Sequence, residues 1–157
     1  MTNGIAIDVG RTRLLTFSPF AREAWWAMGA DLRLPRGSRI TKGREVRRGF
    51  DLGRSASSGP VVVYAFDRGD ARPPRYALVV RAKWGDAVTR NRQRRLLREA
   101  FRTSRPELPA GFDFVLLPRS AFAEAAMPQV REALRDATRR AARRFGEEGP
   151  GTPRKRP

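Results

Sequence analysis

Hydrophobic and polar positions alternate in blocks along the middle of the chain and predict strands and helices in turn. Val61 to Phe66 (VVVYAF) is β-branched and aromatic, which is typical of a strand, and Arg75 to Arg81 (RYALVVR) predicts a second one. Gly69 and two prolines predict a turn from Asp67 to Pro74. Phe112 to Pro118 (FDFVLLP) predicts a third strand. Because the first strand is apolar on both of its faces, we expect both faces of the sheet to be covered.

Three segments place apolar residues at the three- and four-residue spacing of an amphipathic helix. The first spans about residues 39–50 and ends near Gly53, and a loop is expected from Ser55 to Pro60. The second spans about residues 86–103, and the third about residues 128–145. The apolar stripe of the second consists of Val88, Leu96, Leu97 and Phe101. That of the third consists of Val130, Leu134, Ala137, Ala141 and Phe145. This order of elements predicts an α+β sandwich with one small sheet.

The two ends of the chain depart from this pattern. Residues 1–32 contain an apolar patch around Trp25 and Trp26 without a clear period, and form an N-terminal extension whose order the pattern does not indicate. Residues 146–157 (GEEGPGTPRKRP) combine Gly, Pro and charge, and are expected to be a disordered basic tail. Residues 33–145 remain for a single domain.

The charge balance points to a polyanionic partner. The 157 residues include 33 Lys and Arg against 16 Asp and Glu, a formal net charge of +17. Such self-repulsion stabilises no fold, so we expect the excess charge to meet a nucleic acid. Nearly all of the cations are Arg, which binds phosphate through two parallel hydrogen bonds and stacks on bases.

The absence of two residue types narrows the chemistry. The chain contains no Cys and no His. Disulfide scaffolds, thiolate or His-ligated metal sites, and Ser-His or Cys-His nucleophiles are therefore excluded. The sequence has no run of 18 apolar residues and does not begin in the charge-first order of a signal peptide, so we expect a cytoplasmic protein without a membrane partner.

Positive charge is concentrated from Trp84 to Arg102 (WGDAVTRNRQRRLLREAFR), most of which lies on the second predicted helix. Two neighbouring rows at helical spacing result, namely Arg90, Arg94 and Arg98, and Asn91, Arg95 and Arg102. Like charges at that spacing destabilise an isolated helix, so their presence indicates a compensating partner. A merely solvated helix face usually mixes both signs, whereas here only Glu99 opposes the arginines.

The string from Gly85 to Arg102 resembles the signature helix of the bacterial ribonuclease P protein family. It contains an Arg-Asn-Arg step (Arg90 to Arg92), a basic pair (Arg94 and Arg95) and an Arg-Glu pair (Arg98 and Glu99). The resemblance covers about residues 34–145. The chain departs from the family pattern at a few positions: Val46 stands where an aromatic is usual, Ala77 replaces Gly, Arg81, Ala82 and Lys83 replace Ser-Lys-Lys, and Asp86 replaces Asn.

The resemblance implies a protein subunit of ribonuclease P that has no catalytic residues of its own. In this family the catalyst is an RNA, and the protein binds that RNA and the 5′ leader of precursor tRNA to assist 5′-end maturation. Mg²⁺ is expected to be held mainly by the RNA, and no small-molecule substrate is expected. The implied contacts with the catalytic RNA are Lys83, Arg90, Asn91, Arg92, Arg94, Arg95, Arg98 and Arg102.

The resemblance also implies a cleft for the single-stranded leader between the first helix and the sheet. Its expected residues are Val46, Phe50, Val62 and Tyr64, and for Phe50 a plain core position is the alternative. The implied fold is a two-layer α+β sandwich with a small central sheet and an unusual left-handed βαβ crossover (ribosomal protein S5 domain 2-like). General topology rules alone predict a right-handed crossover.

The sequence favours this function over three others. A ribosomal-type rRNA-binding protein shares the charge, size and Arg-rich helices. A metal-dependent nuclease needs several converging carboxylates, which no spacing here suggests. Asp113 alternates with Phe112 and Phe114, so we expect it to face solvent or to pair with an Arg. Binding of duplex DNA is the least favoured, because the sequence has no helix-turn-helix pattern.

Overall fold

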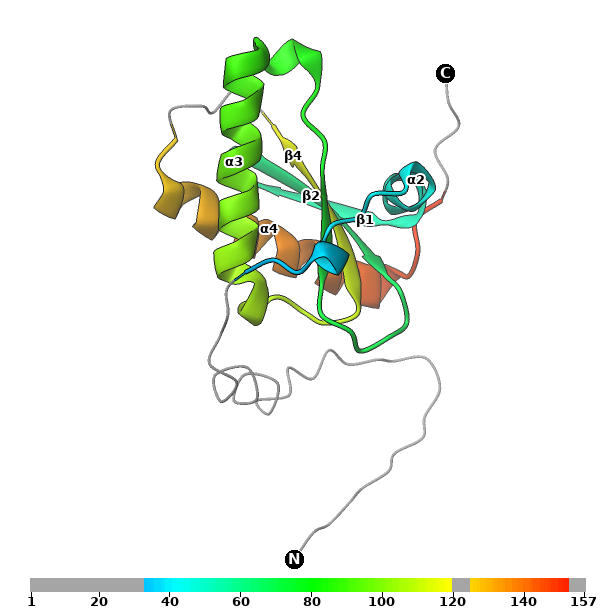
Figure 1. Cartoon of the computed structure of the whole chain (residues 1–157). Helices are drawn as coiled ribbons and strands as arrows, with labels where there is room; N and C mark the ends of the chain where they lie inside the picture. The colour runs from blue at the N-terminus through cyan, green and yellow to red at the C-terminus, as the bar shows by residue number, and fades with distance from the viewer. Residues whose placement is uncertain (1–32, 120–124, 153–157) are drawn as a thin grey trace, which may run out of the picture.

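The computed structural model describes residues 33–119 and 125–152 (Figure 1). The N-terminal extension 1–32 therefore lies outside the described residues. The elements in chain order are η1 (Arg36–Ser38), α2 (Gly43–Leu52), β1 (Arg54–Ser58), β2 (Val61–Asp67), β3 (Arg75–Leu78), η2 (Ala82–Trp84), α3 (Ala87–Ser104), η3 (Arg105–Glu107), β4 (Phe112–Pro118) and α4 (Met127–Glu148). No helix of the described part is long and apolar enough to cross a membrane.

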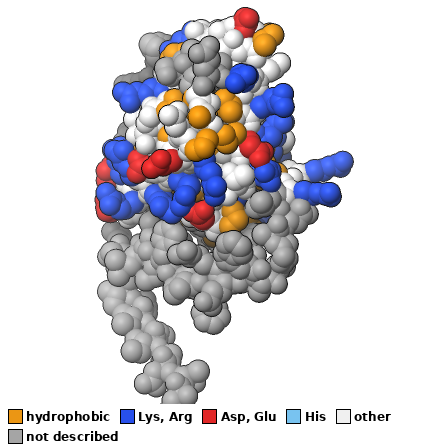
Figure 2. All heavy atoms as spheres, turned by 90° about the vertical axis from the view of Figure 1, so that its left-hand side faces the viewer, with side chains coloured by type: hydrophobic (Ala, Val, Ile, Leu, Met, Phe, Trp, Pro, Cys, Tyr) orange, Lys and Arg blue, Asp and Glu red, His pale blue; other side chains and the backbone are white. Residues whose placement is uncertain are grey.

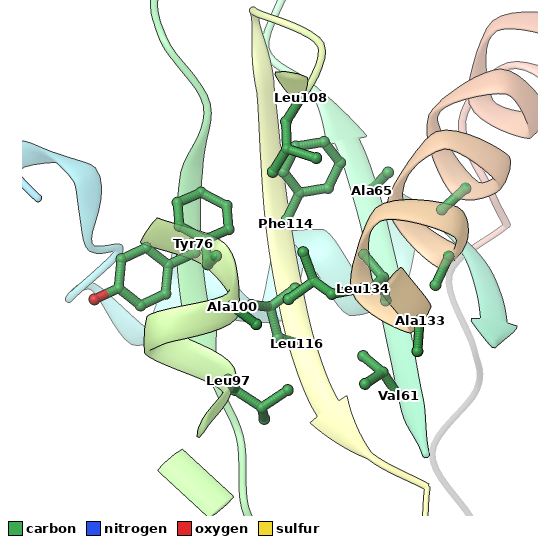
Figure 3. Packing of buried hydrophobic residues seen from close by; sticks show 14 of the residues in the cluster. Val61, Ala65, Tyr76, Leu97, Ala100, Leu108, Phe114, Leu116, Ala133 and Leu134 are labelled. Carbon is green, nitrogen blue, oxygen red and sulfur yellow. The ribbon is translucent and has the colours of Figure 1, made fainter. Parts of the chain in front are cut away.

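The four strands form one sheet in the order β1-β2-β4-β3. β1 and β2 form an antiparallel hairpin, and β2 is also antiparallel to β4. β3 lies parallel to β4 at the other edge, and α3 connects the two. In Figure 3, α3 lies in front of the sheet, β4 points downward and β4 lies to the right of β3, so with the strands turned to point upward the path from β3 to β4 leads to the left. The βαβ unit is thus left-handed, against the general rule.

Helices α3 and α4 cover one face of the sheet, and the short helix α2 lies on the other face (Figure 1). The main core lies on the α3 and α4 side, where side chains of β2, β4 and both helices interlock (Figure 3). Its fully buried members include Val61, Val63, Phe114, Leu97, Phe101 and Leu134. Because side chains alternate along β2, Val62 and Tyr64 point to the face that α2 covers only in part.

Strand β1 corrects the expected loop from Ser55 to Pro60. Its sequence (RSASS) has little β propensity, so the pattern of residues does not reveal it. The strand forms because β2 pairs with its inner edge, and α4 covers its outer edge. There Arg144 Nη1 donates to the Ser55 carbonyl at 2.7 Å and Arg140 Nη1 to the Ser57 carbonyl at 3.1 Å.

The first helix begins later than predicted, at Gly43 rather than near residue 39. The preceding residues are extended instead, and Ile40 N donates to the Tyr76 carbonyl at 2.8 Å. Val88 was wrongly placed in the apolar stripe of the second helix, because it lies in the first turn of α3 and its side chain is 76% exposed. β3 ends at Leu78 and not at Arg81.

The prediction of a disordered tail from residue 146 is wrong for residues 146–148, which belong to α4. Pairs from Arg143 to Glu147 and from Arg144 to Glu148 support this last turn. The chain beyond it crosses the end of α2, where Gly151 N donates to the Leu52 carbonyl at 2.7 Å. Residues 153–157 lie outside the described part.

Helix α2 approaches the sheet closely at Gly49, and Gly49→Ala is expected to destabilise the protein. A Cβ atom there would lie 2.8 Å from Cγ2 of the buried Val115. The steric cost of about 1–3 kcal/mol outweighs a gain of about 1 kcal/mol in helix propensity, so we expect a net loss in unfolding free energy. Gly43→Ala is the matched control, because nothing lies within 4 Å of its added Cβ. Equal denaturant midpoints for the two variants would contradict this packing.

Candidate nucleic-acid interface

Helix α3 is anchored at its start and packed along one stripe, which leaves a broad outer face. Asp86 caps the helix by accepting a hydrogen bond from Thr89 N at 2.8 Å, and this bond lowers the pKa of Asp86. Aspartate and asparagine both cap helices in this way, so the departure from the family at this position keeps the cap. The buried residues of α3 are Gln93, Leu97, Ala100, Phe101 and Ser104.

The arginines of α3 lie on the faces of the helix that are outside the buried stripe. Arg92, Arg95 and Arg98 are exposed, and Arg90 and Arg94 are half-buried at the border of the packed stripe. Two of them bond to neutral groups: Arg94 Nη1 donates to Asn91 Oδ1 at 3.1 Å, and Arg90 Nε donates to the Asp86 carbonyl at 3.3 Å. Neither Arg90, Arg94, Arg95 nor Arg98 forms an ion pair with an acidic residue of the described ranges.

Helix α4 carries as many arginines, but each of them lies within ion-pair distance of an acid of the protein. Glu107, just after α3, lies against three arginines one turn apart, Arg131, Arg135 and Arg139. The other three pair with acids four residues away, Arg140 with Asp136, Arg143 with Glu147 and Arg144 with Glu148. The two Arg-rich helices therefore differ: the charge of α4 has partners inside the molecule, and much of the charge of α3 does not.

Two predicted supporting contacts have different surroundings. Lys83, in η2, is exposed with its Nζ atom 4.6 Å from the centre of the Trp84 ring, so its charge remains available beside the start of α3. Arg102 is instead held by Glu99, to which its Nε atom donates at 2.9 Å. This bond lowers the pKa of Glu99 and raises that of Arg102. Arg102 thus neutralises the acid that opposes the arginines of α3.

A second feature lies on the opposite face of the sheet, where α2 covers only part of it. The rings of Phe50 and Tyr64 meet edge to face with their centres 5.0 Å apart. Together with Val46 they are partly buried and pack against Ala77 and Val115. Val62 is also partly exposed and shares the strand face of Tyr64. Three of the residues predicted for the cleft, Val46, Phe50 and Tyr64, therefore come together between α2 and β2, and Val62 lies two residues away along the same strand face.

At the N-terminal half of α2 the same face carries a buried ion cluster around Asp113. This carboxylate is 5% exposed and accepts from Arg75 Nε at 2.8 Å, Arg75 Nη2 at 2.6 Å and Arg68 Nη1 at 2.6 Å. Glu45 of α2 lies 3.3 Å from Arg75 and connects the helix to the cluster. These bonds raise the pKa of Arg75. The alternative that Asp113 pairs with an Arg is confirmed, and solvent exposure is not.

Known proteins share this arrangement of sequence and fold. The family model described as Ribonuclease P matches residues 34–142. The ribonuclease P protein component of Xanthomonas euvesicatoria is 40% identical over 121 residues, which cover 76% of this chain and 81% of the relative.

Solved structures agree with this match. The RNase P protein from Thermotoga maritima superposes with a TM-score of 0.59 at 31% identity, covering 65% of this chain and 96% of that protein. The RNase P protein from Staphylococcus aureus superposes with a TM-score of 0.58 at 26% identity, covering 66% of this chain and 94% of that protein. The chain belongs to the ribonuclease P protein family.

Membership of the ribonuclease P protein family confirms the resemblance seen at Arg90 to Arg92. The predicted residues divide into two surfaces of this family member. One surface is formed by the arginines of α3, with Lys83 beside the start of that helix, on the face of the sheet that α3 and α4 cover. The other lies on the face that α2 covers and is formed by Val46, Phe50, Val62 and Tyr64. Their individual roles stay predictions.

Some residues of interest give no signal in the sequence. The cluster of Arg68, Arg75 and Asp113 joins three segments that only the folded sheet brings together. Met127, at the start of α4, lies beside Leu96 and Arg92 of α3 around a surface hollow. The even spacing of Arg in α4 resembles that in α3, and only the positions of the acids distinguish the two helices.

Proposed function

We propose that this ribonuclease P family member is the protein subunit of ribonuclease P. It binds the catalytic RNA through α3 and the 5′ leader of precursor tRNA in the cleft beside α2. The observation that carries the proposal is the contrast between the two Arg-rich helices. Guanidinium groups without acidic partners keep their full charge for phosphate, and arginines one helical turn apart, about 5.4 Å, suit successive phosphates of a folded strand.

The cleft suits a single strand because it presents an aromatic pair within a basic protein. Bases without a pairing partner stack on aromatic faces whatever their sequence. Tyr64 fits this role well, because its hydroxyl tolerates a wet site and its ring already has Phe50 as a neighbour. The partly exposed Val62 extends the apolar floor along the same strand.

The described residues do not form a carboxylate cluster for a magnesium ion. Within residues 33–119 and 125–152, no three Asp or Glu side chains lie close enough to hold one metal ion. The Asp113 carboxylate is occupied by Arg68 and Arg75. In the proposed complex Mg²⁺ is held mainly by the RNA partner, and the protein contributes RNA binding in the cytoplasm.

Val46→Phe is expected to tighten binding of precursor tRNA. Val46 packs beside Phe50 and Tyr64, and an aromatic ring there adds a stacking surface worth about 1 kcal/mol, or about fivefold in affinity. The measurement compares precursor tRNA and leaderless mature tRNA, each bound to the holoenzyme assembled with the variant or with wild type. Only the precursor should gain. Equal affinities of wild type and variant for the precursor would count against the cleft.

A competition experiment tests the proposed function itself. The full chain is bound to a labelled bacterial ribonuclease P RNA at several salt concentrations, with an rRNA fragment of equal length as competitor. The proposal expects the ribonuclease P RNA to be preferred at every salt concentration, because non-specific phosphate contacts weaken together as salt rises. Equal competition by the rRNA fragment would favour a ribosomal-type binding protein instead.

A further inference from the structure

A surface hollow lies where the middle of α3 meets the first turn of α4. Its lining residues are Arg92, Arg95, Leu96, Arg98, Glu99 and Met127, and its volume is about 450 Å³. This volume falls within the range of small-ligand pockets, about 300–1,000 Å³. Figure 2, which faces the left-hand side of Figure 1, shows a group of hydrophobic side chains with mostly basic and some acidic side chains around it.

The floor of the hollow is apolar and comes from two helices. Leu96 lies at the edge of the buried stripe of α3, and its side chain is only partly buried against the core. Met127 is the first residue of α4 and is likewise partly buried against the core. The two side chains line the same hollow, one from each helix, and form its apolar part.

The rim of the hollow is positive. Arg95 and Arg98 are exposed and form no ion pair with an acid of the described residues. Glu99, the one acid of the lining, is bound by Arg102, and that hydrogen bond lowers the pKa of Glu99 and holds it in the ion pair. An anionic ligand therefore meets the guanidinium groups of Arg95 and Arg98, which have no acidic partner among the described residues, and a carboxylate that is already paired.

We propose that this hollow receives an unpaired nucleobase of the RNA that α3 binds. The base packs on Leu96 and Met127, while Arg95 and Arg98 hold the phosphates on either side of it. This inference rests on the proposed function and adds to it a site for one base. A nucleobase joined to phosphates matches both an apolar floor and a cationic rim.

Other occupants match only half of the site. A second copy of the chain would bring another net charge of +17 against the same rim. An apolar peptide would cover the floor but leave Arg95 and Arg98 without compensating charge, which is costly where they lose water. The chemistry of the hollow therefore favours RNA over protein.

The test uses the full chain and a bacterial ribonuclease P RNA, with affinity measured across a series of salt concentrations. Met127→Ala is expected to weaken binding about fivefold, while the slope of log K against log salt stays unchanged, because a base contact releases no counterions. Arg95→Ala is expected to weaken binding and to reduce the slope by about 0.7–0.9. Met127→Leu, which keeps a large apolar side chain, should retain most of the wild-type affinity.

Val88→Ala is the matched control, because Val88 is an exposed apolar residue of the same helix outside the hollow. It should bind as wild type does. Leu96→Ala serves as a second variant and is compared only if its unfolding midpoint matches wild type. Wild-type affinity for Met127→Ala, or an equal loss for Val88→Ala, overturns the inference but leaves the proposed function standing. If wild type does not prefer ribonuclease P RNA, the proposed function itself fails.

Discussion

Replacing Arg90 and Arg94 together by alanine is expected to weaken binding of ribonuclease P RNA at least tenfold, or about 1.4 kcal/mol. Both side chains are half-buried beside the packed stripe of α3, and their positions are fixed by bonds to Asn91 and to the Asp86 carbonyl. They reach a phosphate with little further loss of side-chain freedom. Two lost phosphate contacts should also reduce the slope of log K against log salt by about 1.5.

The control is a double variant of α4 that removes the same charge. Arg139 and Arg143 are exposed but have Glu107 and Glu147 as partners. Arg139→Ala/Arg143→Ala should therefore leave both the affinity and the salt slope close to wild type. Equal losses in the two double variants would show that only net charge matters, and the assignment of the interface to α3 would then be wrong.

Asp113→Ala is expected to lower the unfolding free energy by about 3–5 kcal/mol. The substitution leaves Arg68, which is largely buried, and Arg75, which is partly buried, without the carboxylate that accepts from both. The loss of one partner of a buried ion cluster costs more than the cluster contributes, because the remaining charges stay buried. Chemical denaturation at neutral pH, with the slope of the transition checked against wild type, measures this effect.

Asp136→Ala is the control for Asp113. Asp136 pairs with Arg140 at 3.5 Å, but half of its side chain is exposed to solvent. Exposed pairs of this kind contribute about 0–1 kcal/mol, so the midpoint should hardly move. If Asp113→Ala were as mild as Asp136→Ala, the ion cluster would not be what holds the N-terminal half of α2 against the sheet.

Much of the fold is visible in the sequence because strong local signals coincide with burial. β2 and β4 are long apolar runs, and both are confirmed. Helices α3 and α4 also lie where the apolar period predicts them. β1 was missed because Ser55, Ser57 and Ser58 have little preference for a strand, and the strand depends on β2 and on Arg140 and Arg144 of α4.

The candidate site is predictable where it lies on a single element. The Arg rows of α3 follow from helical spacing alone, although Val88 shows that the same spacing misplaces a residue of the first turn that has no core to cover. Contacts between elements could not be predicted. The partners of Asp113 and the position of Met127 beside Leu96 depend on how the helices pack on the sheet.

The most direct test is cleavage of precursor tRNA at low Mg²⁺ by the purified protein, by a bacterial ribonuclease P RNA, and by both together. A protein subunit should make correct 5′ cleavage much faster when both are present, and the Arg90→Ala/Arg94→Ala variant should lose this stimulation. Cleavage by the protein alone would contradict the account and indicate a nuclease. Tight RNA binding without any stimulation would contradict it as well, and would indicate a ribosomal-type binding protein.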